Sequence, residues 1–184
     1  MNWFKHPLSD VQTENIGTDT RVWQYAVILK GATIGKNCNI NCHTFIENDV
    51  VIGDQVTLKS GVFIWDGIRI DNNVFIGPNA TFVNNSYPRS QQYPDKHIGA
   101  HICKGVSIGA NATIMGNITI GEFAMIGAGS MVTKDVPPFT LWFGNPAKQK
   151  GYVTAEGIIL NHEMIDTKTG DEYYFENNQL LKKV

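Results

Sequence analysis

The sequence predicts an all-β protein in which short parallel strands stack into a solenoid, and two regularities support this fold class. Every sixth residue is apolar from residue 16 to 82 and again from residue 102 to 132, at 18 of 18 positions. A small or β-branched residue follows four places later in each unit, and glycine, asparagine and aspartate separate the units. The sixth-residue positions are Ile16, Val22, Ile28, Ile34, Ile40, Ile46, Ile52, Leu58, Ile64, Ile70, Ile76, Phe82, Ile102, Ile108, Ile114, Ile120, Ile126 and Val132.

This period of six excludes an amphipathic helix and a continuous strand. An amphipathic helix needs apolar residues at alternating spacings of three and four. A continuous strand alternates every two residues and would not tolerate a turn residue in each unit. Each unit is therefore a short strand followed by a turn, and because one unit cannot bury its apolar face alone, successive units must stack.

The elements follow in order along one chain of 184 residues, which suits a single domain. Residues 1–15 form an N-terminal lead-in, residues 16–137 the solenoid with an interrupting loop at 88–101, and residues 138–184 a tail. In the tail, two strand-like runs flank Thr169-Gly170 and predict a β-hairpin, with a third short strand near Leu180 and Leu181. We expect the tail to cap the open end of the solenoid, because an exposed edge invites aggregation.

Composition excludes several classes of function. A net charge of −2 and a pI near 6.2 provide no electrostatic basis for binding nucleic acid or an anionic membrane. The first ten residues contain no signal-peptide core, and no stretch approaches 18 apolar residues. The three cysteines match neither a CxxC motif nor a disulfide framework. We expect a soluble, cytoplasmic protein.

The run of residues 108–138, followed by Gly-Asn-Pro-Ala-Lys at 144–148, resembles the hexapeptide-repeat acyltransferases. The resemblance implies a left-handed parallel β-helix of triangular section with three hexads per coil, and hence about six coils. It also implies a homotrimer with active sites between subunits. In this family coenzyme A lies along the outside of the helix, with its phosphorylated end near the C-terminal coils.

With 18 residues per coil, residues 18 apart stack, and one corner column reads Lys30, Asn48, Asp66 and Asn84. The interrupting loop begins just after Asn84, and loops on rigid repeats tend to carry binding and catalysis. Asparagine and aspartate also fill such corners simply because they tolerate left-handed backbone geometry. Both interpretations stay open for this column.

A narrower resemblance covers residues 38–90 and 151–157, which are similar to the nucleotide-linked amino-sugar N-acetyltransferases of bacterial surface-glycan biosynthesis. Those enzymes carry a Thr-Phe-x-Asn-Asp stretch whose asparagine is implicated in orienting the amine. Here Asn84 matches this asparagine, while Asn85 replaces the acid. The implied acceptor is a dTDP-linked 3-amino-3,6-dideoxyhexose, and a UDP-linked 2-acetamido-3-amino-hexuronate is the alternative.

The expected donor is acetyl-CoA, held on a face almost free of side chains. Smooth backbone there could bind an extended cofactor arm, although glycine also serves tight turns. Lysines near the C-terminal end could neutralise phosphates, or they could simply be solvated. The candidate cofactor-binding residues are Gly109, Ala110, Gly116, Gly127, Ala128, Lys134 and Lys148, with Lys150 nearby.

Acetyl transfer to an amine requires an oriented nucleophile, donors for the developing oxyanion and a route for the proton. The candidate catalytic residues are Asn84, His43 and Asp66, with His43 or Asp66 as a base if a side chain serves as one. The candidate substrate-binding residues are Trp65, Asn85, Arg89 and Lys96; the last two could bind a diphosphate and Trp65 could stack on base or sugar. Trp65 could equally belong to a subunit interface.

Three further functions compete with this one. A zinc enzyme like the γ-type carbonic anhydrases would need His43, His97 and His101 to converge across subunits. The second competitor is a non-catalytic β-helix scaffold, and the third is a sugar or serine O-acetyltransferase. Our expectation is an N-acetyltransferase without a metal.

Overall fold

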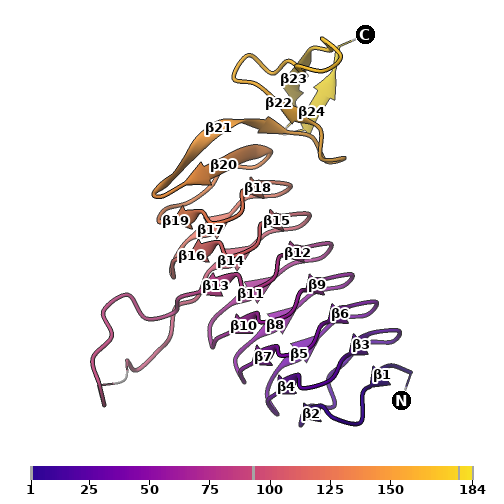
Figure 1. The fold of residues 1–184 in the computed structure, drawn as a ribbon, viewed down its shortest axis with the longest axis vertical. Helices are drawn as coiled ribbons and strands as arrows, with labels where there is room; N and C mark the ends of the chain where they lie inside the picture. Colours follow the sequence, from indigo (N-terminus) through magenta and orange to yellow (C-terminus); the bar gives the residue numbers. More distant parts are fainter. Residues whose placement is uncertain (1, 93, 178, 184) are drawn as a thin grey trace.

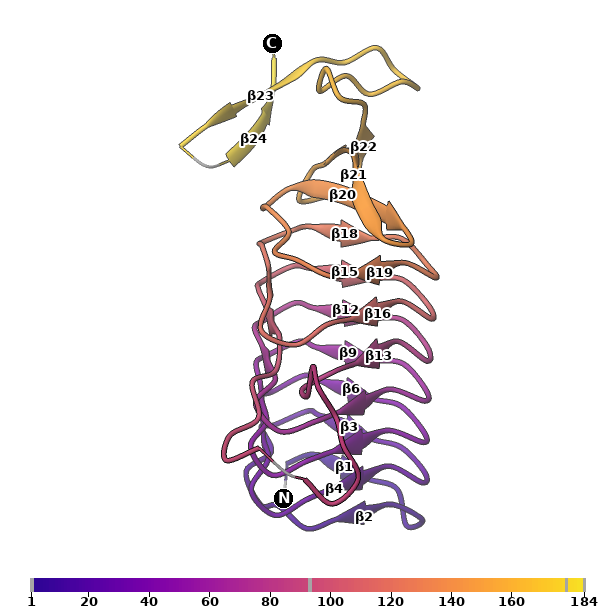
Figure 2. The same cartoon turned by 90° about the vertical axis from the view of Figure 1, so that its left-hand side faces the viewer.

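The chain is a stack of parallel coils, consistent with the left-handed β-helix that the sequence analysis expects (Figures 1 and 2). The computed structural model describes residues 2–92, 94–177 and 179–183. No described residue belongs to a helix that could cross a membrane. Three sheets, which we name A, B and C, form the three faces of the stack, and consecutive strands alternate between them.

The strands of each face follow in stacking order. Sheet A contains β1 (Phe4–Lys5), β3 (Arg21–Val22), β6 (Asn39–Ile40), β9 (Thr57–Leu58), β12 (Phe75–Ile76), β15 (Ser107–Ile108), β18 (Met125–Ile126), β20 (Thr140–Gly144), β21 (Ala147–Val153) and β22 (Ile159–Leu160). Sheet B contains β2 (Asp10–Val11), β4 (Val27–Ile28), β7 (Phe45–Ile46), β10 (Phe63–Ile64), β13 (Thr81–Phe82), β16 (Thr113–Ile114) and β19 (Met131–Val132). Sheet C contains β5 (Thr33–Ile34), β8 (Val51–Ile52), β11 (Arg69–Ile70), β14 (His101–Ile102) and β17 (Thr119–Ile120), and a separate hairpin pairs β23 (Tyr173–Glu176) with β24 (Gln179–Lys182).

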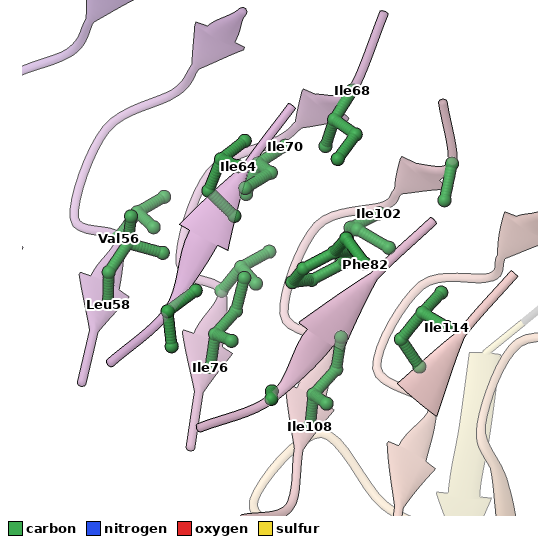
Figure 3. Close-up of a cluster of buried hydrophobic side chains, with 14 of the residues drawn as sticks. Val56, Leu58, Ile64, Ile68, Ile70, Ile76, Phe82, Ile102, Ile108 and Ile114 are labelled. Atoms are coloured by element: carbon green, nitrogen blue, oxygen red, sulfur yellow. The ribbon is translucent and has the colours of Figure 1, made fainter. Parts of the chain in front are cut away.

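The predicted apolar columns fill the interior of the coils (Figure 3). Every sixth-residue position from Val22 to Val132 is buried, and Ile16 is packed against the same cluster. Each two-residue strand from β3 to β19 buries its second residue and turns its first outward, so the interior is a continuous apolar column. At about 25 cal/mol per Å² of buried apolar surface, this column is the main source of stability.

The interrupting loop is displaced from its predicted position at 88–101. Phe63 pairs with Phe45 at a spacing of 18 residues, whereas His101 pairs with Arg69 at a spacing of 32. Ser86, which continues the second inner column in the sequence, is exposed, while Ala100 is buried in its place. The insertion therefore begins directly after Asn84, and His101 already belongs to β14.

The lead-in and the tail also differ from expectation in detail. Residues 4–5 and 10–11 pair with β3 and β4 and add an N-terminal coil, at a spacing of 17 that the hexad count misses. At the other end β20 continues sheet A in parallel with β18, and β21 folds back over it as a cap (Figure 2). Around Thr169-Gly170 the chain does pair antiparallel, through a bridge between Ile165 and Glu172 and a backbone hydrogen bond from the Tyr173 N–H to Met164, but no strand ladder extends from this turn in the described residues. The tail hairpin forms instead between β23 and β24, where the sequence predicts the third short strand.

Candidate active site

The corner between sheets B and C is formed by Asp66, Asn84 and Gly116, and we call it the Asn84 corner. The insertion leaves the β-helix there and projects from its side (Figure 1). Asn84 and Ile98 both lie against Gly116 of the next coil, since a Cβ on Gly116 would meet the carbonyl oxygen of Ile98 and the Cα of Asn84. The root of the loop is therefore fixed by close packing at this corner.

Left-handed backbone geometry does not explain the polar residues of this column. Asn37, Asn73 and Asn79 adopt positive φ at other corners, but Asp66 and Asn84 do not. Instead, Asp66 holds the adjacent coil: its carboxylate Oδ1 accepts a hydrogen bond from the Asp49 backbone N–H at 2.6 Å. One carboxylate oxygen of Asp66 thus has a structural role.

Asn84 uses its side chain differently from Asp66: it donates a hydrogen bond to the neighbouring coil instead of accepting one. Its Nδ2 donates to the backbone carbonyl of Asp66 at 3.0 Å, so the amide is oriented by the coil beneath it. Among the hydrogen bonds of the described residues, neither the Asn84 Oδ1 nor the Gly116 N–H takes part in one. The corner therefore offers an oriented amide acceptor and a backbone donor beside each other.

The loop residues proposed for substrate binding lie around or beyond this corner. Asn85 is half-buried, and its Oδ1 accepts from the Tyr87 N–H at 3.1 Å, which begins the loop turn. Arg89 and Lys96 are exposed and form no ion pair among the described residues. Their cationic groups are available to an anionic ligand.

An aromatic groove of about 430 Å³ runs across sheet B below the Asn84 corner. Trp65, directly before Asp66, lies 5.6 Å from Phe45 and 5.8 Å from Phe63, measured between ring centroids. At the far side of the groove, His43 stacks on Tyr25 at 5.0 Å with a φ of 58°. The groove thus joins Trp65 to His43, but His43 and Asn84 occupy different corners of the chain.

The smooth donor face lies at the corner between sheets A and B, where Ala110 and Ala128 turn small side chains outward. The backbone amides of this face divide into two groups. The N–H groups of Gly109 and Gly127 donate to Ile126 and Trp142 of the next coil, and a Cβ at either glycine would collide with that coil. Coil stacking therefore explains these two glycines, whereas the N–H groups of Ala110 and Ala128 take part in no hydrogen bond among the described residues and lie beside their small side chains.

Two lysines cover the C-terminal end of this face together with a residue that sequence reasoning missed. Phe143 in β20 lies directly over Gly127, is exposed, and faces Lys148 across the β20–β21 pair. The ammonium of Lys150 lies 5.6 Å from the centre of the Phe143 ring. Phe143 lies after the last hexad, so the six-residue period does not predict its position. Only the placement of β20 in the fold shows that Phe143 covers Gly127.

Lys134 does not lie with Lys148 and Lys150 at the donor face. It continues the Asn84 column, and its ammonium lies 5.4 Å from the ring centre of Trp142. The side chain is exposed and therefore remains a candidate cation near the acceptor corner.

The two halves of the candidate site are separated within one chain. Ala110 at the donor face and Gly116 at the Asn84 corner are six residues apart on opposite sides of β16, a span of at most about 20 Å. His43 is at the corner between sheets A and B, whereas His101 begins β14 in sheet C. One chain therefore assembles neither a complete acetyl-transfer site nor the histidine triad of a zinc enzyme.

Comparisons with known proteins agree with this architecture. The profile for the bacterial transferase hexapeptide matches residues 99–134, and that for the hexapeptide repeat of succinyl-transferase matches residues 43–78. A dTDP-3-amino-3,6-dideoxy-α-D-galactopyranose 3-N-acetyltransferase from Aneurinibacillus thermoaerophilus is 54% identical over 150 residues, covering 82% of this chain and 78% of the relative.

Two solved structures share the fold. A hexapeptide-repeat acetyltransferase from Vibrio cholerae, complexed with acetyl coenzyme A, is 28% identical with a TM-score of 0.55, over 74% of this chain and 69% of the other. A mutant perosamine N-acetyltransferase from Caulobacter crescentus, in complex with CoA and GDP-perosamine, has a TM-score of 0.62 at 23% identity, over 72% of this chain and 56% of the other.

The stacked hexads, the corner asparagine and these matches define an enzyme class: the chain belongs to the hexapeptide-repeat acyltransferases. Within that class, its sequence groups with a sugar-nucleotide N-acetyltransferase over most of both chains.

Proposed function

We propose that the protein transfers the acetyl group of acetyl-CoA to the amine of a nucleotide-linked sugar, with a dTDP-linked 3-amino-3,6-dideoxyhexose as the acceptor. The observation that carries the proposal is Asn84 at the root of the loop: its Nδ2 is fixed on the carbonyl of Asp66, and its side-chain oxygen accepts no hydrogen bond from the residues that the structure describes. The 54% identical relative, named for this acceptor class, supports it.

In the proposed reaction Asn84 accepts a hydrogen bond from the sugar amine and orients the nitrogen lone pair towards the thioester carbonyl. The Gly116 N–H stabilises the negative charge that develops on the carbonyl oxygen. The nitrogen–carbon bond forms as the carbon–sulfur bond breaks, and the amine proton leaves to the departing thiolate or to water. If a side chain takes the proton instead, the second carboxylate oxygen of Asp66 is our candidate at this corner.

The remaining candidate residues on the acceptor side bind the nucleotide sugar. Trp65 and the groove that ends at His43 present aromatic faces to a base or sugar ring. Arg89 and Lys96 are suited to the diphosphate, because their cationic groups are exposed on the loop.

The donor side binds the cofactor along its length. The surface at Ala110 and Ala128 accommodates the CoA arm, since only small side chains project there. At the end of that arm, Lys148 lies beside Phe143, where charge and an aromatic face fit a phosphorylated adenosine.

We infer that the site is completed between chains of a homotrimer, because the donor face and the Asn84 corner lie on different edges of one chain. Two impaired variants therefore test it. An Asn84→Ala chain and a chain with a bulky Ala128→Trp donor face should each lose about 100-fold in activity alone. Refolded together they should regain part of the activity, whereas a site within one chain would give no recovery.

We propose that the enzyme works in the cytoplasm in surface-glycan biosynthesis. The three cysteines are unpaired, as is usual in a reducing compartment.

Release of free CoA thiol with a panel of acceptors tests the proposed function. We expect turnover with dTDP-3-amino-3,6-dideoxyhexoses to exceed turnover with UDP-2-acetamido-3-amino-hexuronates by at least about 100-fold. A site whose hydrogen-bonding groups match one substrate discriminates at least this strongly against a substrate without the matching groups. Preference for the UDP acceptor would favour the alternative substrate, and preference for serine or a neutral sugar would favour O-acetylation. No acetyl-CoA binding by calorimetry at millimolar concentration would indicate a scaffold.

A further inference from the structure

Three side chains with metal-binding atoms converge on the opposite edge of sheet C from the Asn84 corner. Asp71, His101 and Cys103 place one potential ligand atom each within 4.8 Å of one another. His101 Nε2 lies 3.0 Å from Asp71 Oδ1. The ligand types are an imidazole, a thiol and a carboxylate, which is a mixed set of the kind that binds zinc.

The β-helix itself brings these groups together. Asp71 and Cys103 directly follow the paired strands β11 and β14, so they stack in one column. His101 and Cys103 are two residues apart and project on the same side of the chain. The next residue of the column is Gly121, which has no side chain to cover Cys103.

The neighbouring charges favour a cation at this position. Arg69, beneath His101 in the stack, donates to the backbone carbonyl of Asp49 at 2.6 Å and pairs with its carboxylate, so it is directed away from Asp71. The carboxylates of Asp71 and Glu122 act electrostatically on the Cys103 thiol, so this corner is rich in negative charge that a divalent cation would neutralise.

The distances between the ligand atoms allow a tetrahedrally coordinated zinc ion with little rearrangement of the side chains. Zinc bonds of about 2.0–2.2 Å to nitrogen and oxygen place two such ligands about 3.3 Å apart, close to the observed His101–Asp71 separation. Drawing in the Cys103 sulfur requires a movement of up to about 1.3 Å, since the three ligand atoms lie within 4.8 Å of one another. The exposed face of the cluster leaves the fourth position to water.

We propose that Asp71, His101 and Cys103 bind a zinc ion that fastens the return of the inserted loop. Asp71 precedes the insertion and the other two ligands follow it, so the ion connects coils that are 30 residues apart in the chain where the regular repeat is interrupted. Closing a long loop by a metal reduces the freedom of the unfolded segment and stabilises the ordered one. The ion lies at the other end of sheet C from Asn84, so it orders the loop that carries Arg89 and Lys96 without entering the acetyl transfer.

Metal titration of the full-length protein tests this site independently of any enzymatic activity. Protein stripped with a chelator and supplied with zinc should retain about one equivalent per chain after gel filtration. With cobalt instead of zinc it should develop a thiolate-to-cobalt charge-transfer band. Cys103→Ser should abolish the band and His101→Ala should reduce retained zinc at least about tenfold.

Cys42→Ser is the matched control, because Cys42 contacts Ser60 at 3.2 Å on another corner. It should keep both the band and the zinc. Trypsin provides a second readout: zinc should slow cleavage after Arg89 and Lys96 at least about fivefold in the parent protein but not in His101→Ala. The proposal is overturned if the parent protein retains no more zinc than Cys103→Ser, or if the cobalt band survives in a Cys103→Ser variant that circular dichroism shows to be folded.

Discussion

Replacement of Asn84 by alanine separates its structural role from its catalytic one. In the fold, Asn84 contributes one hydrogen bond, from Nδ2 to the carbonyl of Asp66 at 3.0 Å. Removing a hydrogen bond of this kind costs about 1 kcal/mol of the free energy of unfolding. For a chain of this size that lowers Tm by about 2–4 °C.

The catalytic effect should be much larger. Loss of the hydrogen bond to the reacting amine in a partly buried site costs about 1–3 kcal/mol, and a misdirected nucleophile adds to this loss. We therefore expect kcat to fall about 100-fold, which corresponds to about 2.7 kcal/mol in the activation free energy. Acetyl-CoA affinity should change less than about twofold, because the donor face lies on another edge.

Asn72→Ala is the matched control for this experiment. Its Oδ1 accepts one backbone hydrogen bond, from the Asp54 N–H at 2.7 Å, at a corner away from the candidate site. Both variants should lose similar stability in thermal unfolding, but only Asn84→Ala should lose turnover in the thiol-release assay. Equal turnover in the two variants, or a drop in acetyl-CoA affinity as large as the drop in kcat, would refute the assignment of Asn84.

Three further predictions concern other parts of the chain. His43→Asn, which tolerates the observed φ of 58°, should change kcat less than about tenfold, whereas a thousandfold loss in the same assay would move the base to His43. Gly109→Ala should lower stability by about 1–3 kcal/mol because the added Cβ collides with the next coil, while Gly129→Asn, which meets nothing within 4 Å, should be nearly neutral; equal melting temperatures would contradict this packing. The ion pair with Lys182 lowers the pKa of the Asp171 carboxyl, so its contribution is present above the unfolded pKa and disappears as pH falls through the lower folded pKa. The hydrogen-exchange protection factors of the β23–β24 hairpin, corrected for the intrinsic pH dependence of amide exchange, should accordingly fall below about pH 4, and protection factors that do not change between pH 6 and pH 3 would argue against the pair.

The coils could be predicted from sequence because each inner residue repeats the same environment. Ile28, Ile64 and Ile108 fill equivalent places, so a period of six is enough to locate them. The sequence misplaces the insertion boundary because Ser86 satisfies the small-residue pattern as well as Ala100 does. Only the pairing of Arg69 with His101 distinguishes the two.

The candidate site was predictable only in part. The motif and the column identified Asn84, and the structure adds the contact with Asp66 that orients it. The sequence does not show which backbone N–H groups bond between coils: those of Gly109 and Gly127 donate to the next coil, whereas those of Ala110 and Ala128 take part in no hydrogen bond among the described residues. Phe143 lies outside the repeat, where no periodicity predicts which coil it covers.

The linkage formed in the product tests acetyl transfer to a sugar amine most directly. The protein should be incubated with ¹³C-acetyl-CoA and dTDP-3-amino-3,6-dideoxygalactose, and the product analysed by NMR. We predict a single acetyl group in amide linkage to the nitrogen at C3. An ester on a sugar hydroxyl, or no acetylated sugar nucleotide while acetyl-CoA is bound, would contradict that prediction.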